Sequence, residues 1–279
     1  MTTPRVALTI AGSDSSGGAG VQADLRTFSA HGLHGASAFA ALTAQNAVGV
    51  QGVHIVPVEF VAAQIVSVLD DLDVRAVKTG MLATVDIVRC VAQIATERGL
   101  PNLVVDPVMV ASTGARLLEL DAEDAYIEEL IPCARVVTPN RIEAGVLCGR
   151  ELRTVTDMAD AAGELARLGP EAVVVTGGDL DESGESVDIV MIDGTIHELR
   201  APRVRTGNDH GTGCSFASAT AARLALGDDL LTALQHAKSF VHRGLAGAAA
   251  WRLGAGHGPI DHFGWNAQTE LVQPTREEP

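Results

Sequence analysis

The chain is poor in aromatic residues, since phenylalanine, tryptophan and tyrosine together make up 3% of its 279 residues. This shortage excludes a core built on stacked rings. Hydrophobic residues still make up 47% of the chain, so a large core must consist mainly of alanine, valine, leucine and isoleucine. The length allows one large domain or two small ones.

Basic residues are also scarce, with 20 lysines and arginines against 35 aspartates and glutamates, for a formal net charge of −15. Proteins that bind nucleic acid or an anionic membrane need a basic face. The composition therefore argues against both partners, and we interpret the acidic surface as a source of solubility. It does not exclude a phosphate ligand, because backbone amides and a metal ion can hold one.

Cysteine is sparse as well, and no CxxC pair occurs among Cys90, Cys133, Cys148 and Cys214. The wide spacing argues against a zinc site and a thioredoxin-type motif.

Long apolar runs are missing too. The run at residues 6–11 is too short for a signal peptide, and no segment approaches the ~20 residues of a membrane span. We expect a soluble cytoplasmic protein without structural disulfides.

Glycine, in contrast, is abundant and clustered, above all in residues 207–214, Gly-Asn-Asp-His-Gly-Thr-Gly-Cys. An alanine-rich segment without proline follows at residues 215–226 and favours a helix. The free N–H groups and the dipole of such a helix start form an anion site, and a thiol there has its thiolate favoured. The alternative is a glycine loop leading into a packed helix, with Cys214 a small buried residue.

Apolar strand patterns alternate with helical patterns along the chain. This alternation predicts an α/β fold, a mostly parallel sheet covered by helices on both faces. We expect one domain over residues 1–265 and a polar, disordered tail over residues 266–279. Strands are predicted at residues 6–11, 36–45, 53–56, 74–78, 103–105, 136–137, 172–175, 187–192 and 195–199. Helices are predicted at residues 57–69, 85–98, 122–130, 157–168 and 229–252. Two further helices are predicted, one after the first strand that ends near residue 32 and one after residue 143 that ends near residue 148.

Ligands of such folds bind beyond the carboxyl ends of the strands. The residues that follow predicted strands are Gly12, Gln45, Lys78, Thr79, Gly80, Asp106, Asn140 and Thr176. The glycine-rich loop at residues 12–20 follows a strand, but its spacing is neither GxGxxG nor that of a P-loop.

Asp106 and Glu143 are the candidates for a Mg²⁺ site, because Mg²⁺ takes oxygen ligands and is often held by one or two carboxylates. The alternative is that Asp106 caps a turn and Glu143 lies favourably in the first turn of a helix. The anion site makes the metal interpretation more favourable than the alternative, because a metal ion and a loop of backbone amides are the parts needed for phosphoryl transfer. For His210, a hydrogen bond within the loop is preferred over contact with phosphate. The role of Lys78 stays open.

The order of these motifs resembles that of the hydroxymethylpyrimidine/phosphomethylpyrimidine kinases of thiamine biosynthesis. The resemblance covers about residues 6–265. The matching segments are AGSDSSGGAGVQAD at 11–24, TAQN at 43–46, KTGM at 78–81, TPN at 138–140 with Glu143, and HGTGC at 210–214.

The resemblance implies a ribokinase-like three-layer fold, a homodimer, and two successive phosphorylations that use ATP and Mg²⁺. The first makes the monophosphate of 4-amino-5-hydroxymethyl-2-methylpyrimidine, and the second makes the diphosphate. Asp106 and Glu143 would organise Mg²⁺, and Cys214 would be the catalytic base at the end of an anion hole formed by Gly211, Thr212 and Gly213. The pyrimidine would be surrounded by Gly12, Asp24, Gln45, Met81 and Val108. The nucleotide and its phosphates would be bound by Asn140, Thr176, His210 and Lys238.

Two departures from the family pattern concern cations. Family members often have Met-Lys-Gly-Gly-His where this chain has residues 175–179, Val-Thr-Gly-Gly-Asp, so threonine stands at position 176 in place of lysine. They also often have Lys-Asn-Thr where this chain has residues 207–209, Gly-Asn-Asp. Lys238 is the candidate that compensates for the missing charge near the phosphates.

Three alternatives stay open. A pyridoxal kinase shares the fold and the anion loop, and Gln45 and Met81 are the positions that would discriminate it. A non-catalytic pyrimidine-binding relative is suggested only by the threonine at position 176. A nicotinamide-dependent oxidoreductase is weakened by the glycine spacing of the first loop.

Overall fold

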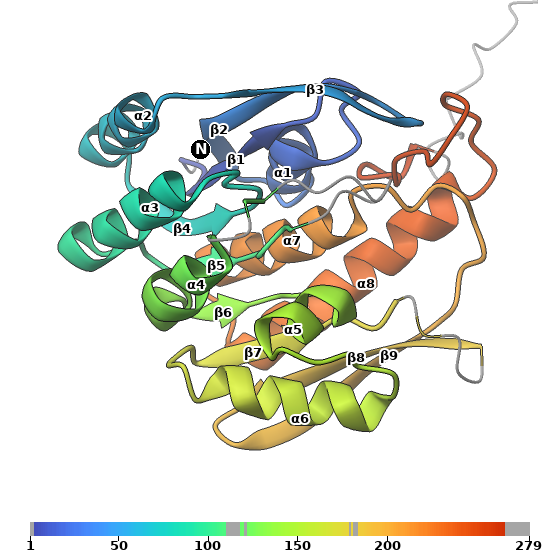
Figure 1. Ribbon diagram of the computed structural model, residues 1–279. Coiled ribbons are helices and arrows are strands. Elements are labelled where there is room, and N and C mark those ends of the chain that lie inside the picture. Colours follow the sequence, from blue (N-terminus) through green and yellow to red (C-terminus); the bar gives the residue numbers. More distant parts are fainter. Residues whose placement is uncertain (1–2, 110–117, 120–121, 179, 181–183, 266–279) are drawn as a thin grey trace, which may run out of the picture.

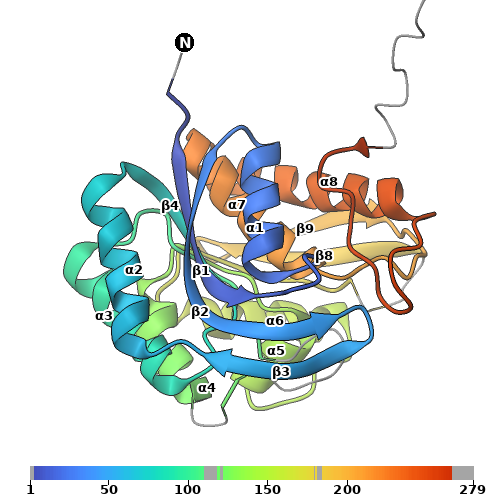
Figure 2. The same ribbon diagram turned by 90° about the horizontal axis from the view of Figure 1, so that it is seen from above.

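The chain forms three layers, with a central β-sheet between two layers of helices (Figures 1 and 2). The structure is a computed structural model that describes residues 3–109, 118–119, 122–178, 180 and 184–265. The layers are those expected from the alternation of strands and helices, so the predicted fold class is confirmed. The prediction of a disordered tail at residues 266–279 lies outside the described residues.

The described part of the sheet has nine strands in the order β3-β2-β1-β4-β5-β6-β7-β8-β9. The six neighbouring strands β2, β1, β4, β5, β6 and β7 run parallel. At one edge β3 pairs antiparallel with β2, and at the other edge β8 pairs antiparallel with β7 and with β9. Asp193 and Gly194 form the turn of the β8–β9 hairpin, and an Asp-Gly pair favours such a turn. The strands are β1 (Val6–Ser13), β2 (His34–Asn46), β3 (Gly49–Ile55), β4 (Val74–Thr79), β5 (Val104–Val105), β6 (Val136–Val137), β7 (Ala172–Val175), β8 (Glu185–Ile192) and β9 (Thr195–Pro202).

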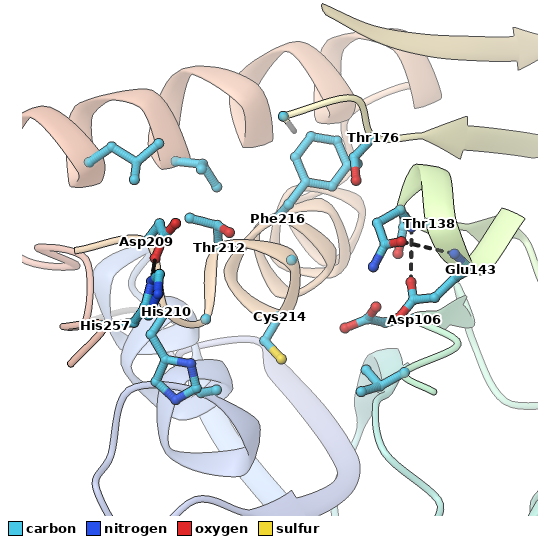
Figure 3. Close-up of a pocket in the computed structure, with 18 of the residues that line it drawn as sticks. Asp106, Thr138, Glu143, Thr176, Asp209, His210, Thr212, Cys214, Phe216 and His257 are labelled. Atoms are coloured by element: carbon cyan, nitrogen blue, oxygen red, sulfur yellow. Dashed lines mark hydrogen bonds and ion pairs between the residues drawn. The ribbon is translucent and has the colours of Figure 1, made fainter. Parts of the chain in front are cut away.

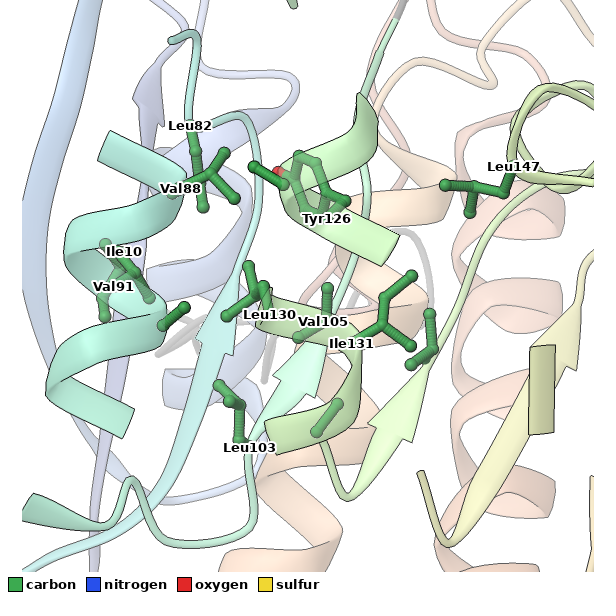
Figure 4. Close-up of a cluster of buried hydrophobic side chains, with 14 of the residues drawn as sticks. Ile10, Leu82, Val88, Val91, Leu103, Val105, Tyr126, Leu130, Ile131 and Leu147 are labelled. Atoms are coloured by element: carbon green, nitrogen blue, oxygen red, sulfur yellow. The ribbon is translucent and has the colours of Figure 1, made fainter. Parts of the chain in front are cut away.

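One face of the sheet is covered by helices from the first two thirds of the chain. Side chains of alternate strand positions, such as Ile10 and Val105, pack against these helices in a continuous apolar cluster (Figure 4). The period of two follows from the pleat of a strand. The helices of this layer are α2 (Val58–Asp71), α3 (Val85–Arg98), α4 (Ala122–Ala125), η1 (Tyr126–Leu130), η2 (Ile131–Cys133), α5 (Arg141–Leu147) and α6 (Val155–Ala166).

The opposite face is covered by α1 (Gly20–Ala30), α7 (Thr212–Leu226) and α8 (Leu230–Ala248) (Figure 2). The neighbouring strand positions, such as Val104 and Val136, point to this side. The alanines of α7 let it pack closely against both α1 and α8, because small side chains allow helices to approach. α7 thus runs through the middle of this layer and begins at the edge of the sheet where the parallel strands end.

Two predicted helices differ from the structure. The segment at residues 122–130 is one α-helical turn, α4, followed by a single π-helical turn, η1, and a 3₁₀ turn. Pro132 lies at the start of this 3₁₀ turn, where its missing N–H group is tolerated. The last helix ends at Ala248 and not at residue 252. Its end is set by Asn208, whose side chain donates to the carbonyl groups of Ala248 and Trp251.

No helix in the described ranges is long and apolar enough to cross a membrane. All four cysteines are free thiols in the structure.

Candidate active site

A cavity of about 830 Å³ opens at the carboxyl ends of the parallel strands. Its wall includes every predicted site residue except Asp24, which agrees with the rule that ligands of such sheets bind at this edge. The predicted residues in the wall are Gly12, Gln45, Met81, Asp106, Val108, Asn140, Glu143, Thr176, His210, Gly211, Thr212, Gly213, Cys214 and Lys238.

The loop before α7 is pressed against the glycine-rich loop after β1. Gly211 has a φ of +80°, and a Cβ atom on it would lie 2.0 Å from the carbonyl oxygen of Gly18. A Cβ atom on Gly18 would in turn lie 2.4 Å from the ring of His210. Both glycines are therefore required by a close approach of two backbones.

A buried hydrogen bond joins the same two loops. The ring of His210 lies 2.8 Å from Oδ2 of Asp14, which also accepts from the N–H groups of Gly18 and Ala19. Burial alone would raise the pKa of Asp14, but hydrogen bonds from His210, Ser16 and Ala19 lower it to about 2. An ionised carboxylate only accepts, so the ring nitrogen of His210 donates. These contacts support the preferred structural role of His210.

The first turn of α7 faces the cavity (Figure 3). Within the described part of the chain, no side chain caps this helix start. The first N–H groups of a helix have no intrahelical acceptor. They and the helix dipole are therefore available to an anion, as the sequence predicts.

Cys214 lies in this turn with its sulfur directed toward Asp106 (Figure 3). Burial is the main effect on the thiol, and the charges of Asp106 and Asp24 act in the same direction. Lys78 and the N–H group of Gly20 act against them, but the pKa of Cys214 still rises to about 12. The prediction of a favoured thiolate is therefore wrong for the free protein, because burial and the nearby carboxylates raise the pKa of the thiol.

Asp106 and Glu143 lie next to each other across from Cys214 (Figure 3). Glu143 accepts from the N–H group of Asn140 at 2.9 Å and completes the capping box of α5. Burial, followed by the charge of Asp106, raises the pKa of Glu143 to about 8. Burial also raises the pKa of Asp106, against the charge of Lys78. Two adjacent buried carboxyl groups of this kind favour either a proton or a cation between them.

These donors fit a Mg²⁺ ion. Among the described residues, Oδ2 of Asp106 is buried and has no hydrogen-bond partner. In the described ranges, no group of three or more histidine, cysteine, aspartate or glutamate side chains is arranged so that it could hold a metal ion by itself. Mg²⁺ does not need such a group, because it retains waters and binds substrate phosphates beside one or two carboxylates.

Gln45, near the end of β2, is held at the other end of the cavity by Ser15 and by Thr43 of its own strand. Its backbone N–H donates to the hydroxyl of Ser15 at 2.8 Å, and its carbonyl accepts from the same hydroxyl at 2.7 Å. Its carboxamide lies 3.2 Å from the hydroxyl of Thr43. Met81 closes this end against Gly12, where a Cβ atom would lie 2.3 Å from the methionine Cε. This end is narrow, partly apolar and supplied with one amide group.

Asp24 requires a correction. Its side chain is fully buried beneath the cavity and forms no part of the wall. Its oxygens accept from the hydroxyl groups of Thr9 and Ser218, both at 2.6 Å, and from Lys78. The carboxylate is thus fully occupied by the protein, so direct contact with a bound ring is not supported.

Lys238 and Thr176 lie in the wall at the far end of the cavity, beyond α7. The ammonium group of Lys238 donates to Asp188 at 2.7 Å and to Ser186 at 2.9 Å. Asp188 also accepts from the N–H group of Gly177 at 3.1 Å, which ties the chain after β7 to Lys238. A lysine has three donors, so one N–H of Lys238 stays available to a ligand.

Three residues of this site received no role from the sequence. Asp14 is hidden among the serines and glycines of its loop. Asp188 and Lys78 are charged residues inside apolar strands, and this is the signal that would have identified them. A charged side chain in a buried strand needs a partner, because an unpaired buried charge is costly.

Comparison with known proteins decides the family. Residues 14–261 match the family model described as phosphomethylpyrimidine kinase. The chain belongs to the phosphomethylpyrimidine kinase family. It is 47% identical over 259 residues to a hydroxymethylpyrimidine/phosphomethylpyrimidine kinase of Rhizobium meliloti, and the match covers 92% of this chain and 97% of the relative.

Longer relatives in the family contain more than this unit. The chain is 46% identical to the thiamine biosynthetic bifunctional enzyme TH1 of Arabidopsis thaliana, over 92% of its own length but only 49% of that of TH1. Among solved structures, an ADP complex of Bacillus subtilis pyridoxal kinase superposes with a TM-score of 0.86 at 37% identity, covering 95% of this chain and 100% of that one.

Family membership settles the class of the protein. It is a phosphotransferase with a ribokinase-like fold, and ATP is the phosphoryl donor of such kinases. The alternative of a nicotinamide-dependent oxidoreductase is wrong, in agreement with the glycine spacing of the first loop. A non-catalytic relative is not supported either.

Proposed function

We propose that this kinase transfers the γ-phosphoryl group of ATP first to 4-amino-5-hydroxymethyl-2-methylpyrimidine and then to the resulting monophosphate. The observation that carries this proposal is the layout of one continuous cavity. Gly12, Gln45, Met81 and Val108 line one end, and the open helix start at residues 211–214 faces the middle. A small aromatic ring at the first end directs a substituent toward the anion site.

The chemistry follows from this layout. The substrate oxygen attacks the γ-phosphorus, the bond from that phosphorus to the leaving oxygen of ADP breaks, and the hydroxyl proton passes to a base. Cys214 is the candidate base, and the N–H groups of residues 212–214 stabilise the charge on the transferring group. Phosphoryl transfer depends mainly on such positioning and electrostatics.

Asp106 and Glu143 are the proposed holders of Mg²⁺. When bound, the ion supplies positive charge that neutralises the phosphates of the nucleotide. The two buried carboxyl groups support the assignment, because a cation between them relieves the repulsion that raises the pKa of Glu143.

Lys238 is the proposed cation at the nucleotide end. It lies in the same wall as Thr176, where the family often has lysine, and Asp188 holds it in place. Asn140 lies beside Thr176, to which its backbone is bridged, and the amide of Asn140 is used to cap α5.

The test is a product assay with purified protein, ATP and Mg²⁺. Separate reactions contain the hydroxymethylpyrimidine, its monophosphate, pyridoxal, or no acceptor. We expect monophosphate from the first reaction and diphosphate from the second. Folded protein that makes neither product contradicts the proposal, and a diphosphate missing only from the second reaction limits it to the first step.

Pyridoxal is included because the superposed Bacillus subtilis enzyme is a pyridoxal kinase whose whole length matches this chain. Pyridoxal also carries a hydroxymethyl group on an aromatic ring. A higher kcat/KM for pyridoxal than for the pyrimidine would make pyridoxal kinase the main activity.

Replacing Gln45 by alanine tests the ring-binding end. Loss of a buried hydrogen-bond partner costs ~1–3 kcal/mol of binding free energy. We therefore expect the affinity for the hydroxymethylpyrimidine to fall by about five- to a hundredfold, measured by calorimetry. Gln51→Ala is the control, because Gln51 is exposed on β3 outside the cavity wall. Equal affinities of both variants and the wild type would remove Gln45 from the site.

We also infer a homodimer in the cytoplasm. The exposed apolar side chains Leu42, Val53 and Ile55 on β2 and β3 support a contact with a second copy. The four free thiols support a reducing compartment. Light scattering of the purified protein measures the oligomeric state.

A further inference from the structure

A buried ion pair lies directly beneath the catalytic wall and has no role in the description so far. It consists of Asp24 on α1 and Lys78 at the end of β4, and both side chains are fully buried. The ammonium group lies 3.0 Å from Oδ1 and 3.1 Å from Oδ2 of Asp24. With the hydroxyl groups of Thr9 and Ser218, each carboxylate oxygen has two donors. Asp24 therefore acts through Lys78 and not on a ligand.

Lys78 extends from this anchor to the floor of the cavity. It is part of the wall, and its ammonium group lies 3.5 Å from Oδ2 of Asp106. Gly80 makes the room, because a Cβ atom there would lie 2.8 Å from Nζ of Lys78. Burial alone would lower the pKa of Lys78, but the charge of Asp24, 3.0 Å away, raises it well above its usual range. The side chain is therefore a permanent cation under the site.

The same Asp106 lies opposite the sulfur of Cys214 and beside Glu143 (Figure 3). The part of the cavity wall formed by Asp106 and Glu143 therefore has the fixed positive charge of Lys78 behind it. The other lysine in the cavity wall, Lys238, is held by Asp188 and Ser186 at the far end. Lys78 is therefore the lysine whose charge acts on Asp106.

We propose that Lys78, anchored by Asp24, is a positioning residue for phosphoryl transfer. It holds the Asp106 carboxylate toward Cys214 and weakens the attraction of the empty protein for a divalent cation, so that the cation enters with the nucleotide phosphates. This inference rests on the proposed function for its catalytic part. Its electrostatic part concerns the free protein alone.

The test compares two variants that differ in one buried charge. Lys78→Met by itself would leave the Asp24 carboxylate unpaired in the interior, which is strongly destabilising. We therefore compare Asp24→Asn with Asp24→Asn/Lys78→Met. Replacing a buried ion pair by neutral groups of similar size is often tolerated, and methionine adapts to an irregular space.

The first measurement is Mn²⁺ binding to the nucleotide-free protein, followed by the electron paramagnetic resonance signal of free Mn²⁺. We expect the double variant to bind Mn²⁺ about tenfold or more tightly than Asp24→Asn, because a unit charge a few ångströms away is removed. Arg75→Met is the control, since Arg75 lies on the same strand with its charge on the surface beside Asp73. We expect it to bind Mn²⁺ as the wild type does.

The second measurement is steady-state kinetics. We expect the double variant to lose about tenfold in kcat relative to Asp24→Asn, while KM for the pyrimidine changes less than about threefold. Equal Mn²⁺ affinities in the two folded variants overturn the proposal, and so does a lower kcat without a change in Mn²⁺ affinity, which indicates a purely structural role.

Asp24→Asn leaves Lys78 paired with the carboxylate of Asp106, 3.5 Å away, so this single variant keeps the test decisive if the double variant does not fold. It leaves the cation of Lys78 less compensated, so we expect Mn²⁺ binding several-fold weaker than in the wild type. Unchanged binding overturns the proposal. A wild type that phosphorylates no acceptor contradicts the proposed function instead, and the Mn²⁺ comparison still stands.

Discussion

Gly211→Ala is expected to lower turnover by about a hundredfold or more. The added Cβ would lie 2.0 Å from the carbonyl oxygen of Gly18 and 3.0 Å from its carbonyl carbon. Both atoms belong to a backbone that is itself fixed by Asp14, so the loop at residues 207–213 must move. A displacement of about 1 Å at a catalytic group costs on the order of a hundredfold in rate.

The same substitution should also lower the free energy of unfolding by about 1–3 kcal/mol, because alanine is strained at a φ of +80°. Gly207→Ala is the matched control in the same loop. No described atom lies within 4 Å of a Cβ at Gly207, and its φ is not in the left-handed region. We expect its kcat and melting temperature to equal those of the wild type.

The measurements are kcat, nucleotide affinity and thermal unfolding for the three proteins. A Gly211→Ala enzyme that is as fast as Gly207→Ala would show that the close approach of the two loops does not position the anion site.

Cys214→Ala is expected to lower turnover by at least about a hundredfold while nucleotide binding and fold persist. General-base catalysis is worth ~10²–10⁴-fold. The lower part of this range is expected, because phosphoryl transfer depends mainly on electrostatics and positioning. Cys214→Asp should retain more activity than Cys214→Ala, since a carboxylate also accepts a proton, although its charge repels the phosphates.

The pH dependence follows from the raised pKa of Cys214, about 12. At neutral pH almost all of the thiol is protonated, and its thiolate fraction grows tenfold with each pH unit below the pKa. The single-turnover rate of the wild type should therefore rise with pH between about 6 and 9. A carboxyl group has a lower pKa than a thiol in the same surroundings, so the rate of Cys214→Asp should level off at a lower pH than that of the wild type.

Single-turnover rates of the wild type and both variants, measured across this pH range, decide the role of the thiol. A Cys214→Ala enzyme as fast as the wild type at every pH would reduce Cys214 to a packing residue. Catalysis would then rest on the N–H groups of the helix start and on Mg²⁺.

Much of the candidate site could be predicted because its residues occur in short segments at the ends of apolar strands. The strand at residues 172–175 is followed by Thr176, and the glycines at 211 and 213 precede an alanine-rich helix. Such patterns depend on neighbours in the chain, and the topology of a parallel sheet brings the strand ends to one edge.

Predictions that depended on burial or on distant partners failed. The end of α8 is set by Asn208, which is 40 residues from Ala248. The turns at residues 122–133 depend on how Tyr126 and Leu130 fit between α3 and the sheet. Composition indicates a helix in both cases but carries no information on these contacts.

The sequence by itself determined the α/β class, the motifs at the strand ends and the family, because periodicity and local spacing are properties of the chain. Only the tertiary structure decided the state of Cys214 and the position of Asp24. Asp24 is bound by Ser218, 194 residues away, and by Lys78, 54 residues away. The pKa of Cys214 depends on its burial among Lys78, Asp106 and Asp24. Charges and desolvation act through space, so they are defined only after these segments have come together.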